Sequence, residues 1–192
     1  MAEYIIKGGK KIEGEVMISG SKNASLPIIA ASILNQGTTT LYNVPDIHDT
    51  QMMYEILKKL GAEVIKKKNK IIIDSSKITN YEIPEELMRQ MRSSVIFVGA
   101  LLGRYGKATF SYPGGCDIGT RPIDLHLKAF EKLGININKN YGNITCSCDK
   151  IVGEKIDLDF PSVGATENAI LVACLGMRKN HHNKFCKRTR NY

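Results

Sequence analysis

The sequence lacks a hydrophobic run long enough to cross a membrane. Its longest apolar stretch, residues 95–102, is far short of the roughly 20 residues that a transmembrane helix needs. Residues 1–11 lack the basic-then-apolar layout of a signal peptide. We therefore expect a cytoplasmic protein with no membrane partner.

The cysteines do not form the even set of a disulfide framework. There are five, in a sequence without an export signal, which indicates reduced thiols. Cys146 and Cys148 are spaced C-x-C, but they lie in a strand-like run, 143–148, whose alternation places both side chains on one face. Because no second cysteine pair or nearby histidine completes a zinc set, we expect strand thiols and no metal.

Acidic residues are absent from residues 177–192, which hold six basic side chains. The net charge of +8 therefore comes mostly from this end, since residues 1–176 carry 21 basic and 19 acidic groups. A nucleic-acid-binding protein usually spreads its basic residues over a face or a helix. With 43% hydrophobic residues, the nearly neutral body is expected to form a globular core, and we expect no nucleic-acid partner.

An internal repeat organises this body. The segment LKKLGAEVIKKKNKIIID at 57–74 returns as FEKLGININKNYGNITCS at 130–147. Both copies predict a helix end, a glycine C-cap, a strand, a polar turn and a second strand.

The residues before each copy repeat as well. Apolar helical runs at 26–34 and 95–102 are each followed by a glycine-containing turn and a strand, at 38–44 and 107–112. A third helical run, 166–175, begins the cycle again. The sequence predicts an α/β fold of repeated helix-strand units about 70 residues long, with two units and the start of a third.

Residues 177–192 interrupt the third unit, because their apolar residues repeat neither every second residue, as in a strand, nor every 3.6 residues, as in a helix. Suitable synonymous codons for residues 178–192, read one base later, give EKTTTINSAKEPEI, which is similar to TTTLYNVPDIHD at 38–49. We hypothesise a frameshift near Met177, so that residues 1–176 form the partial domain and 177–192 an aberrant basic tail. The alternative is a genuine tail that binds nucleic acid or anionic surfaces.

Two cations occupy equivalent helix starts. Lys22 and Asn23 lie in GSKNAS, where an expected strand at 15–19 turns into a helix, and such a junction suits an anion such as phosphate. Arg92, in MRQMRSS, falls near the same place in the second unit. Alone, each would be a solvated surface residue, but their recurrence indicates a shared anion site.

The motif PGGCDIGTRPIDLH at 113–126 combines a glycine-rich turn with Cys116 and Arg121. Glycines let the backbone approach a ligand closely, and a thiol can act as an acid or a nucleophile near neutral pH. The guanidinium suits phosphate or carboxylate. The alternative is a chance surface cysteine in a flexible loop.

Together, GSKNA, MRSS, PGGCDIGTRPIDLH and SVGATENA resemble the UDP-N-acetylglucosamine 1-carboxyvinyltransferase family over residues 1–176. The resemblance implies an inside-out α/β barrel of the enolpyruvyl transferase type. The shikimate-pathway enolpyruvyl transferases share the repeat architecture but not the Cys116 loop. Two alternatives remain open, namely a fragment of that sister enzyme and a non-catalytic module that binds a nucleotide sugar or a polyanion.

The resemblance implies transfer of an enolpyruvyl group from phosphoenolpyruvate to UDP-N-acetylglucosamine, without a cofactor. Lys22 and Arg121 would hold the phosphate of phosphoenolpyruvate, and Cys116 would serve in proton transfer and react with fosfomycin. Asn23 and Arg92 would lie in the same cleft. The sugar-nucleotide site would be lined by Arg121, Pro122, Ile123, Asp124, Leu125, Ser162, Val163 and Gly164. His126 lies in the motif too, although a histidine on a helix face is often structural.

The family's second domain, with its deprotonating aspartate and a further phosphate-binding arginine, has no counterpart in this sequence. We therefore expect the 192-residue chain alone to have no appreciable transferase activity.

Overall fold

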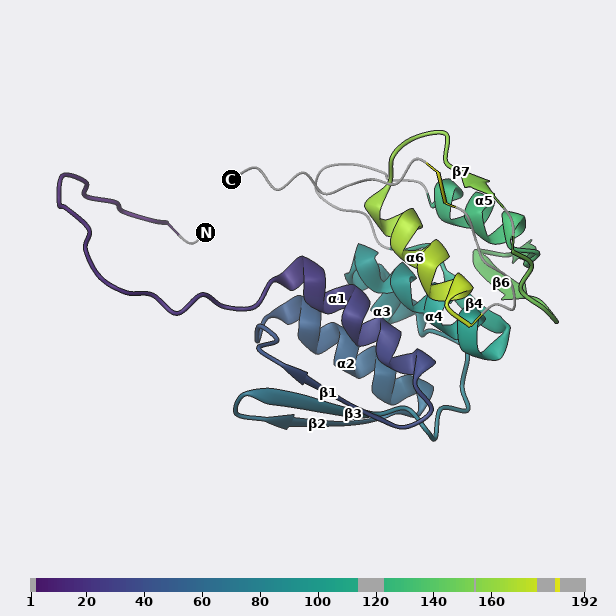
Figure 1. Ribbon diagram of the computed structural model, residues 1–192, viewed down its shortest axis with the longest axis horizontal. Coiled ribbons are helices and arrows are strands. Elements are labelled where there is room, and N and C mark those ends of the chain that lie inside the picture. The colour runs from purple at the N-terminus through teal and green to yellow at the C-terminus, as the bar shows by residue number, and fades with distance from the viewer. Residues whose placement is uncertain (1–2, 114–122, 154, 176–181, 184–192) are drawn as a thin grey trace.

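The computed structural model describes residues 3–113, 123–153 and 155–175, and the backbone of 182–183. Helices occupy the middle of the molecule and two small sheets lie outside them (Figure 1). The first unit consists of α1 (Lys22–Ala31), the 3-10 turn η1 (Ser32–Leu34), β1 (Thr38–Tyr42), α2 (His48–Leu60), β2 (Glu63–Lys67) and β3 (Lys70–Asp74).

The second unit repeats this order, except that its 3-10 turn comes before the first helix. It consists of the 3-10 turn η2 (Arg92–Val95), α4 (Ile96–Tyr105), β4 (Lys107–Ser111), α5 (Asp124–Lys132), β5 (Asn136–Asn140) and β6 (Asn143–Ser147). A short helix, α3 (Glu85–Gln90), links the two units, and β7 (Ile156–Asp157), α6 (Val163–Ala173) and β8 (His182–Asn183) follow. The expected α/β fold of repeated units, with the start of a third, is confirmed.

The two sheets have the same topology. Their strand orders are β1-β3-β2 and β4-β6-β5, and all neighbours are antiparallel. In the central strands, alternate side chains point to the helices, so that Ile71, Ile73, Ile144 and Cys146 are buried. Cys146 and Cys148 lie on this covered side, Cys148 being half-buried, as the alternation predicted.

Left-handed glycines end the second helix of each unit. Gly61 has φ +106° and donates its N–H to the carbonyls of Leu57 and Lys58. Gly134 has φ +80° and donates to the carbonyl of Glu131. These are the two predicted glycine caps, and each reverses the chain into a strand without a Cβ clash.

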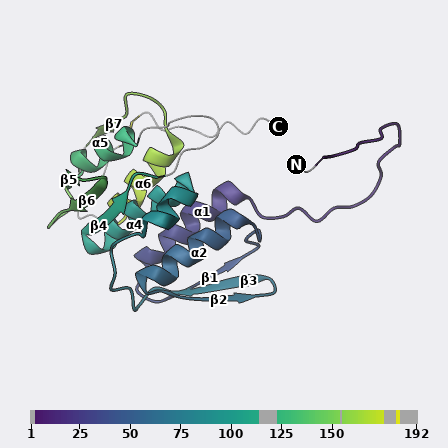
Figure 2. The same cartoon turned by 180° about the vertical axis from the view of Figure 1, so that it is seen from behind.

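Helices α1, α4 and α6 run parallel, so all three begin at the same end of the molecule (Figures 1 and 2). Gly99 faces Asn168 and Gly103 faces Leu171 further along both helices. At the other end, the Arg104 guanidinium donates to the carbonyl of Ile33 over 2.7 Å. The helix starts therefore form one surface of the fold and the helix ends another.

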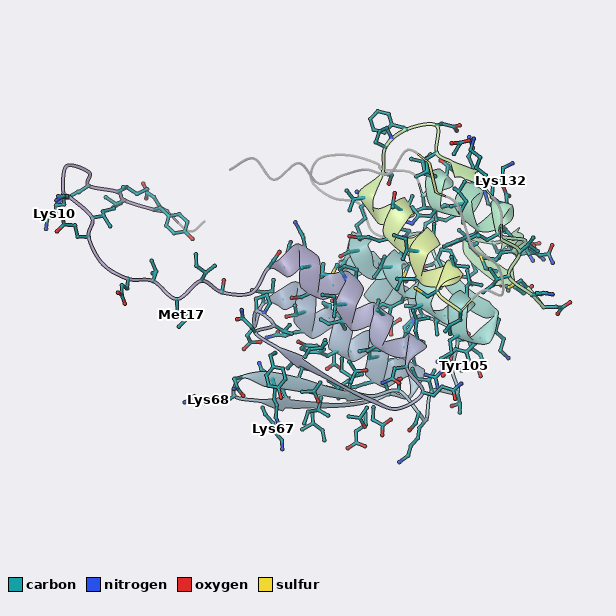
Figure 3. The ribbon with its side chains drawn as sticks, in the orientation of Figure 1. Lys10, Met17, Lys67, Lys68, Tyr105 and Lys132 are labelled. Carbon is teal, nitrogen blue, oxygen red and sulfur yellow. The ribbon has the colours of Figure 1, made fainter. Side chains whose placement is uncertain are left out.

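The expected strand at 15–19 is wrong. Residues 3–20 run away from the body without regular structure and expose apolar side chains such as Met17, which is 97% exposed (Figure 3). A strand requires a hydrogen-bonded neighbour, and no described residue pairs with this segment. The chain enters the body at Gly20, where a Cβ would lie 1.7 Å from the carbonyl oxygen of Asn43.

The proposed tail boundary at residue 177 falls outside the described residues. Of the tail itself, only 182–183 are described, and His182 and Asn183 pair in parallel with Ile156 and Asp157. The frameshift hypothesis stays a prediction. Among the described helices, none is both long and apolar enough to span a bilayer.

Candidate functional site

Four helix starts carry most of the predicted site residues. Lys22 and Asn23 open α1, Arg92 opens the turn before α4, and Val163 and Gly164 open α6 after Ser162. Residue Asp124 opens α5, which packs against α6. Because the first N–H groups of a helix have no partner within it, this end of the molecule concentrates hydrogen-bond donors and the positive ends of helix dipoles.

Helices α1 and α6 begin with the same cap. The hydroxyl of Ser21 accepts from the N–H of Ala24 over 3.4 Å, and that of Ser162 accepts from Ala165 over 3.3 Å. A serine at this position satisfies one of the unpaired N–H groups and fixes where the helix starts. By this correspondence, Lys22 and Asn23 of the first unit occupy the places of Val163 and Gly164 in the third.

Lys22 is held at the surface. Its ammonium group lies 2.8 Å from a carboxylate oxygen of Asp49, in the first turn of α2. The side chains are 49% and 30% exposed, so water screens this pair and it contributes about 0–1 kcal/mol. An anionic ligand can therefore compete for Lys22 at small cost.

Arg92 and His126, on two different elements, lie close enough to interact electrostatically. Arg92 is half-buried on η2, and His126, on α5, is 4% exposed. Burial, and then the positive charge of Arg92, lower the pKa of His126 from 6.5 to about 4. The imidazole is therefore neutral at physiological pH and adds no charge to the one that Arg92 supplies.

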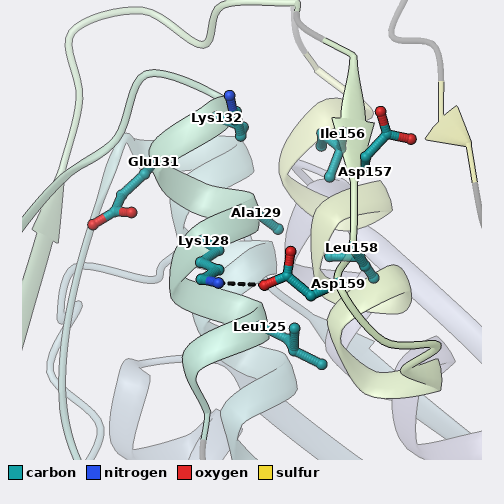
Figure 4. A pocket seen from close by; sticks show the side chains of 9 residues that line it. All are labelled: Leu125, Lys128, Ala129, Glu131, Lys132, Ile156, Asp157, Leu158 and Asp159. Carbon is teal, nitrogen blue, oxygen red and sulfur yellow. Dashed lines mark hydrogen bonds and ion pairs between the residues drawn. The ribbon is translucent and has the colours of Figure 1, made fainter.

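The start of α5 borders a hollow of about 480 Å³ between α5 and β7 (Figure 4). Leu125 lines it together with Ile156 and Leu158, and an ion pair between Lys128 and Asp159 spans it. The hollow thus has an apolar wall next to charged groups.

The first residues of α5 differ in exposure. Asp124 is exposed, whereas Ile123 is buried, so any ligand contact of Ile123 would come from its backbone.

Three predicted site residues, Cys116, Arg121 and Pro122, lie outside the described residues. The structure brings Gly164 against His126, and Arg92 is near enough to affect the charge of His126; Lys22 and Asn23 lie at the same end.

Two of the described thiols, Cys146 and Cys148, do not suit nucleophilic chemistry. Burial raises the pKa of Cys146 to about 12, and burial also raises that of Cys148. A protonated thiol is a poor nucleophile. Nor does any cluster of three His, Cys, Asp or Glu side chains suited to a metal ion occur within the described ranges.

Sequence reasoning missed Asn168. It is fully buried in the apolar helix α6, and its side chain contacts both α4 and His126. The available signal was an amide directly before the apolar run AILVA.

The sequence model of the EPSP synthase (3-phosphoshikimate 1-carboxyvinyltransferase) family matches residues 6–189. Curated relatives named UDP-N-acetylglucosamine 1-carboxyvinyltransferase 2 are 49% identical in Caldanaerobacter subterraneus subsp. tengcongensis and 48% identical in Clostridium tetani. Each alignment covers 91% of this chain and 42% of the relative. The chain thus spans about two fifths of the length of these relatives.

Solved structures share the fold. The enolpyruvyl transferase NikO from Streptomyces tendae superposes with a TM-score of 0.73 at 23% identity, over 88% of this chain and 40% of that one. An EPSP synthase from Acinetobacter baumannii gives 0.69 at 14% identity, over 93% and 41%. We conclude that the chain belongs to the EPSP synthase (3-phosphoshikimate 1-carboxyvinyltransferase) family of enolpyruvyl transferases.

Proposed function

We propose that this chain carries the sugar-nucleotide side of a UDP-N-acetylglucosamine 1-carboxyvinyltransferase site. The names of relatives at 45–49% identity support this substrate over 3-phosphoshikimate. In the proposed reaction, the 3'-hydroxyl of UDP-N-acetylglucosamine loses its proton and its oxygen bonds to C2 of phosphoenolpyruvate, while the methylene carbon gains a proton. The C–O bond to phosphate then breaks and the new methyl group loses a proton, which restores the double bond. This reaction would open peptidoglycan precursor synthesis in the cytoplasm and needs no cofactor.

The observation that carries the proposal is the gathering of helix starts and cations at one end of the fold. Both substrates are polyanions, and the helix starts of α1, α4 and α6, with Lys22 and Arg92, supply donors and positive charge there. The fixed orientation of these dipoles stabilises charge without reorganisation.

The proposed roles follow the predicted motifs. Lys22 and Arg121 would bind the phosphate of phosphoenolpyruvate, and the Cys116 thiol would transfer the proton to its methylene carbon. Asn23 and Arg92 would line the same cleft. The start of α5, with Asp124 and Leu125, and the start of α6, with Ser162, Val163 and Gly164, would bind the sugar nucleotide.

We propose that the 192-residue chain binds UDP-N-acetylglucosamine without turning it over. Mixed with both substrates, the purified chain should release no inorganic phosphate in a coupled phosphate assay. Release at a rate above that of a heat-denatured sample would contradict this.

Isothermal titration calorimetry tests the substrate. UDP-N-acetylglucosamine should bind, and Arg92→Met should weaken binding about tenfold or more, because a charged contact is lost. Arg89→Met is the matched control, since Arg89 is exposed and pairs only with Glu85 on α3 among the contacts seen.

Three outcomes separate the candidate functions. Binding of 3-phosphoshikimate without UDP-N-acetylglucosamine would refute the proposal in favour of the shikimate enzyme. Salt-sensitive binding of RNA that disappears on deletion of 177–192 would favour the polyanion-binding module. Equal affinity of the wild type and Arg92→Met for UDP-N-acetylglucosamine would refute the proposed site.

A further inference from the structure

A single buried amide connects three of the segments that form the candidate site. Asn168 is 0% exposed in α6. Its Oδ1 accepts from the N–H of Gly99 over 2.8 Å, and its Nδ2 donates to the carbonyl of Val95 over 3.0 Å. The same Nδ2 lies 2.8 Å from Nδ1 of His126. Both amide hydrogens and the oxygen are thus used, as a buried amide requires.

The geometry fixes the hydrogen-bond roles. The backbone N–H of Gly99 can only donate and the carbonyl of Val95 can only accept, so the amide cannot be flipped. The second Nδ2 hydrogen must therefore point at His126, whose Nδ1 has to accept it. His126 consequently carries its proton on Nε2 and stays neutral while this contact exists.

Glycines permit the close approach on both sides. A Cβ on Gly99 would lie 2.2 Å from Oδ1 of Asn168. A Cβ on Gly164 would lie 3.2 Å from Cε1 and 3.4 Å from Nε2 of His126. The imidazole is therefore held between the Asn168 amide and the start of α6.

We propose that Asn168 is a positioning residue, whose amide holds the start of α5, through His126, against the turn that carries Arg92. The proposal rests on the function proposed above, because these are the segments assigned to the sugar nucleotide. Asn168 itself lies in the core and contacts no ligand. Its effect on binding is to keep the competent arrangement of Arg92, Asp124 and Gly164 populated before the ligand arrives.

Protonation of His126 is opposed by its surroundings. An added proton on Nδ1 would meet the amide hydrogens of Asn168, and the positive charge of Arg92 on η2 would repel the charged ring. The low pKa of His126 agrees with this arrangement. The neutral ring adds no positive charge to that of Arg92.

Nuclear magnetic resonance of the 192-residue chain tests the contact without any ligand. The imidazole nitrogens of His126 should report the Nε2–H form at pH 7 and show no titration above about pH 5. In Asn168→Asp, a carboxylate opposite Nδ1 should stabilise the protonated ring and raise the pKa of His126, so that the ring titrates above pH 6. Asn138→Asp, on the exposed face of β5, is the matched control and should leave His126 unchanged. An Nδ1–H form in the wild type would overturn the proposal.

Calorimetry with UDP-N-acetylglucosamine then tests the positioning role. His126→Leu removes the acceptor and should weaken binding about tenfold, whereas His126→Gln keeps an acceptor and should bind within about threefold of the wild type. Melting curves confirm that both variants fold. Equal affinities of the two variants would overturn the positioning role alone. Failure of the folded wild type to bind would refute the proposed function, and the positioning role with it.

Discussion

Replacing Gly99 with alanine tests the packing of α4 on α6, on which the site depends. In an exposed helix this change would stabilise by about 1 kcal/mol, because alanine is the better helix former. At Gly99, however, the new Cβ would lie 2.2 Å from Oδ1 and 2.7 Å from the backbone oxygen of Asn168. Contacts this short do not occur, so the helices must separate or the amide must move.

Overpacking costs about 1–3 kcal/mol and an unpaired buried amide about 1–3 kcal/mol, which together exceed the propensity gain. We expect Gly99→Ala to lower the free energy of unfolding by about 3 kcal/mol, or the melting temperature by about 6–12 °C. Gly37→Ala is the control, because no atom lies within 4 Å of a Cβ there. Circular dichroism during urea and thermal unfolding measures both. A Gly99→Ala protein as stable as Gly37→Ala would refute the close α4–α6 contact.

Three further predictions concern stability and reactivity. The pKa of His126 is about 4 in the folded protein, against 6.5 ordinarily, so neutral His126 does not reduce the free energy of unfolding above pH 6.5. Between pH 6.5 and 4, urea titrations should show that the free energy of unfolding falls by about 3 kcal/mol, because the unfolded chain binds this proton more tightly. His126→Gln should abolish this part of the pH dependence. Arg104→Met removes donors to the carbonyls of Ile33 and Ser75 and should cost about 2 kcal/mol, while the surface change Arg89→Met should cost less than about 0.5 kcal/mol in the same assay. Iodoacetamide at pH 8 should alkylate exposed Cys174 well before buried Cys146, and peptide mass spectrometry would contradict this if both reacted at one rate.

The repeat could be predicted because local signals encode it. Gly61 and Gly134 need a left-handed conformation, and the apolar runs that lead into β1 and β4 have helical spacing. The strand expected at 15–19 failed because a local sequence signal shows only that a segment could pair. It does not show that a neighbouring strand exists, and none of the described residues provides one.

The positions of some candidate site residues were predictable, because the repeat relates them to one another. That Arg92 falls near the place of Lys22 followed from the repeat; Lys22 is the first residue of α1, and Arg92 is the first residue of the 3-10 turn that precedes α4. The role of Asn168 could not be predicted, because it depends on which residue of α4 lies opposite. A polar residue in a helix is usually solvent-exposed, and only the packing of Gly99 against it reveals a buried bridge.

We propose above that the sugar nucleotide binds at the helix starts. Titration of the ¹⁵N-labelled chain with UDP-N-acetylglucosamine tests it directly, through the amide chemical shifts. The largest changes should occur at Asp124, Leu125 and Gly164. Largest changes at Gly106 and Lys150, which line a hollow of about 430 Å³ where α4 ends, would contradict it.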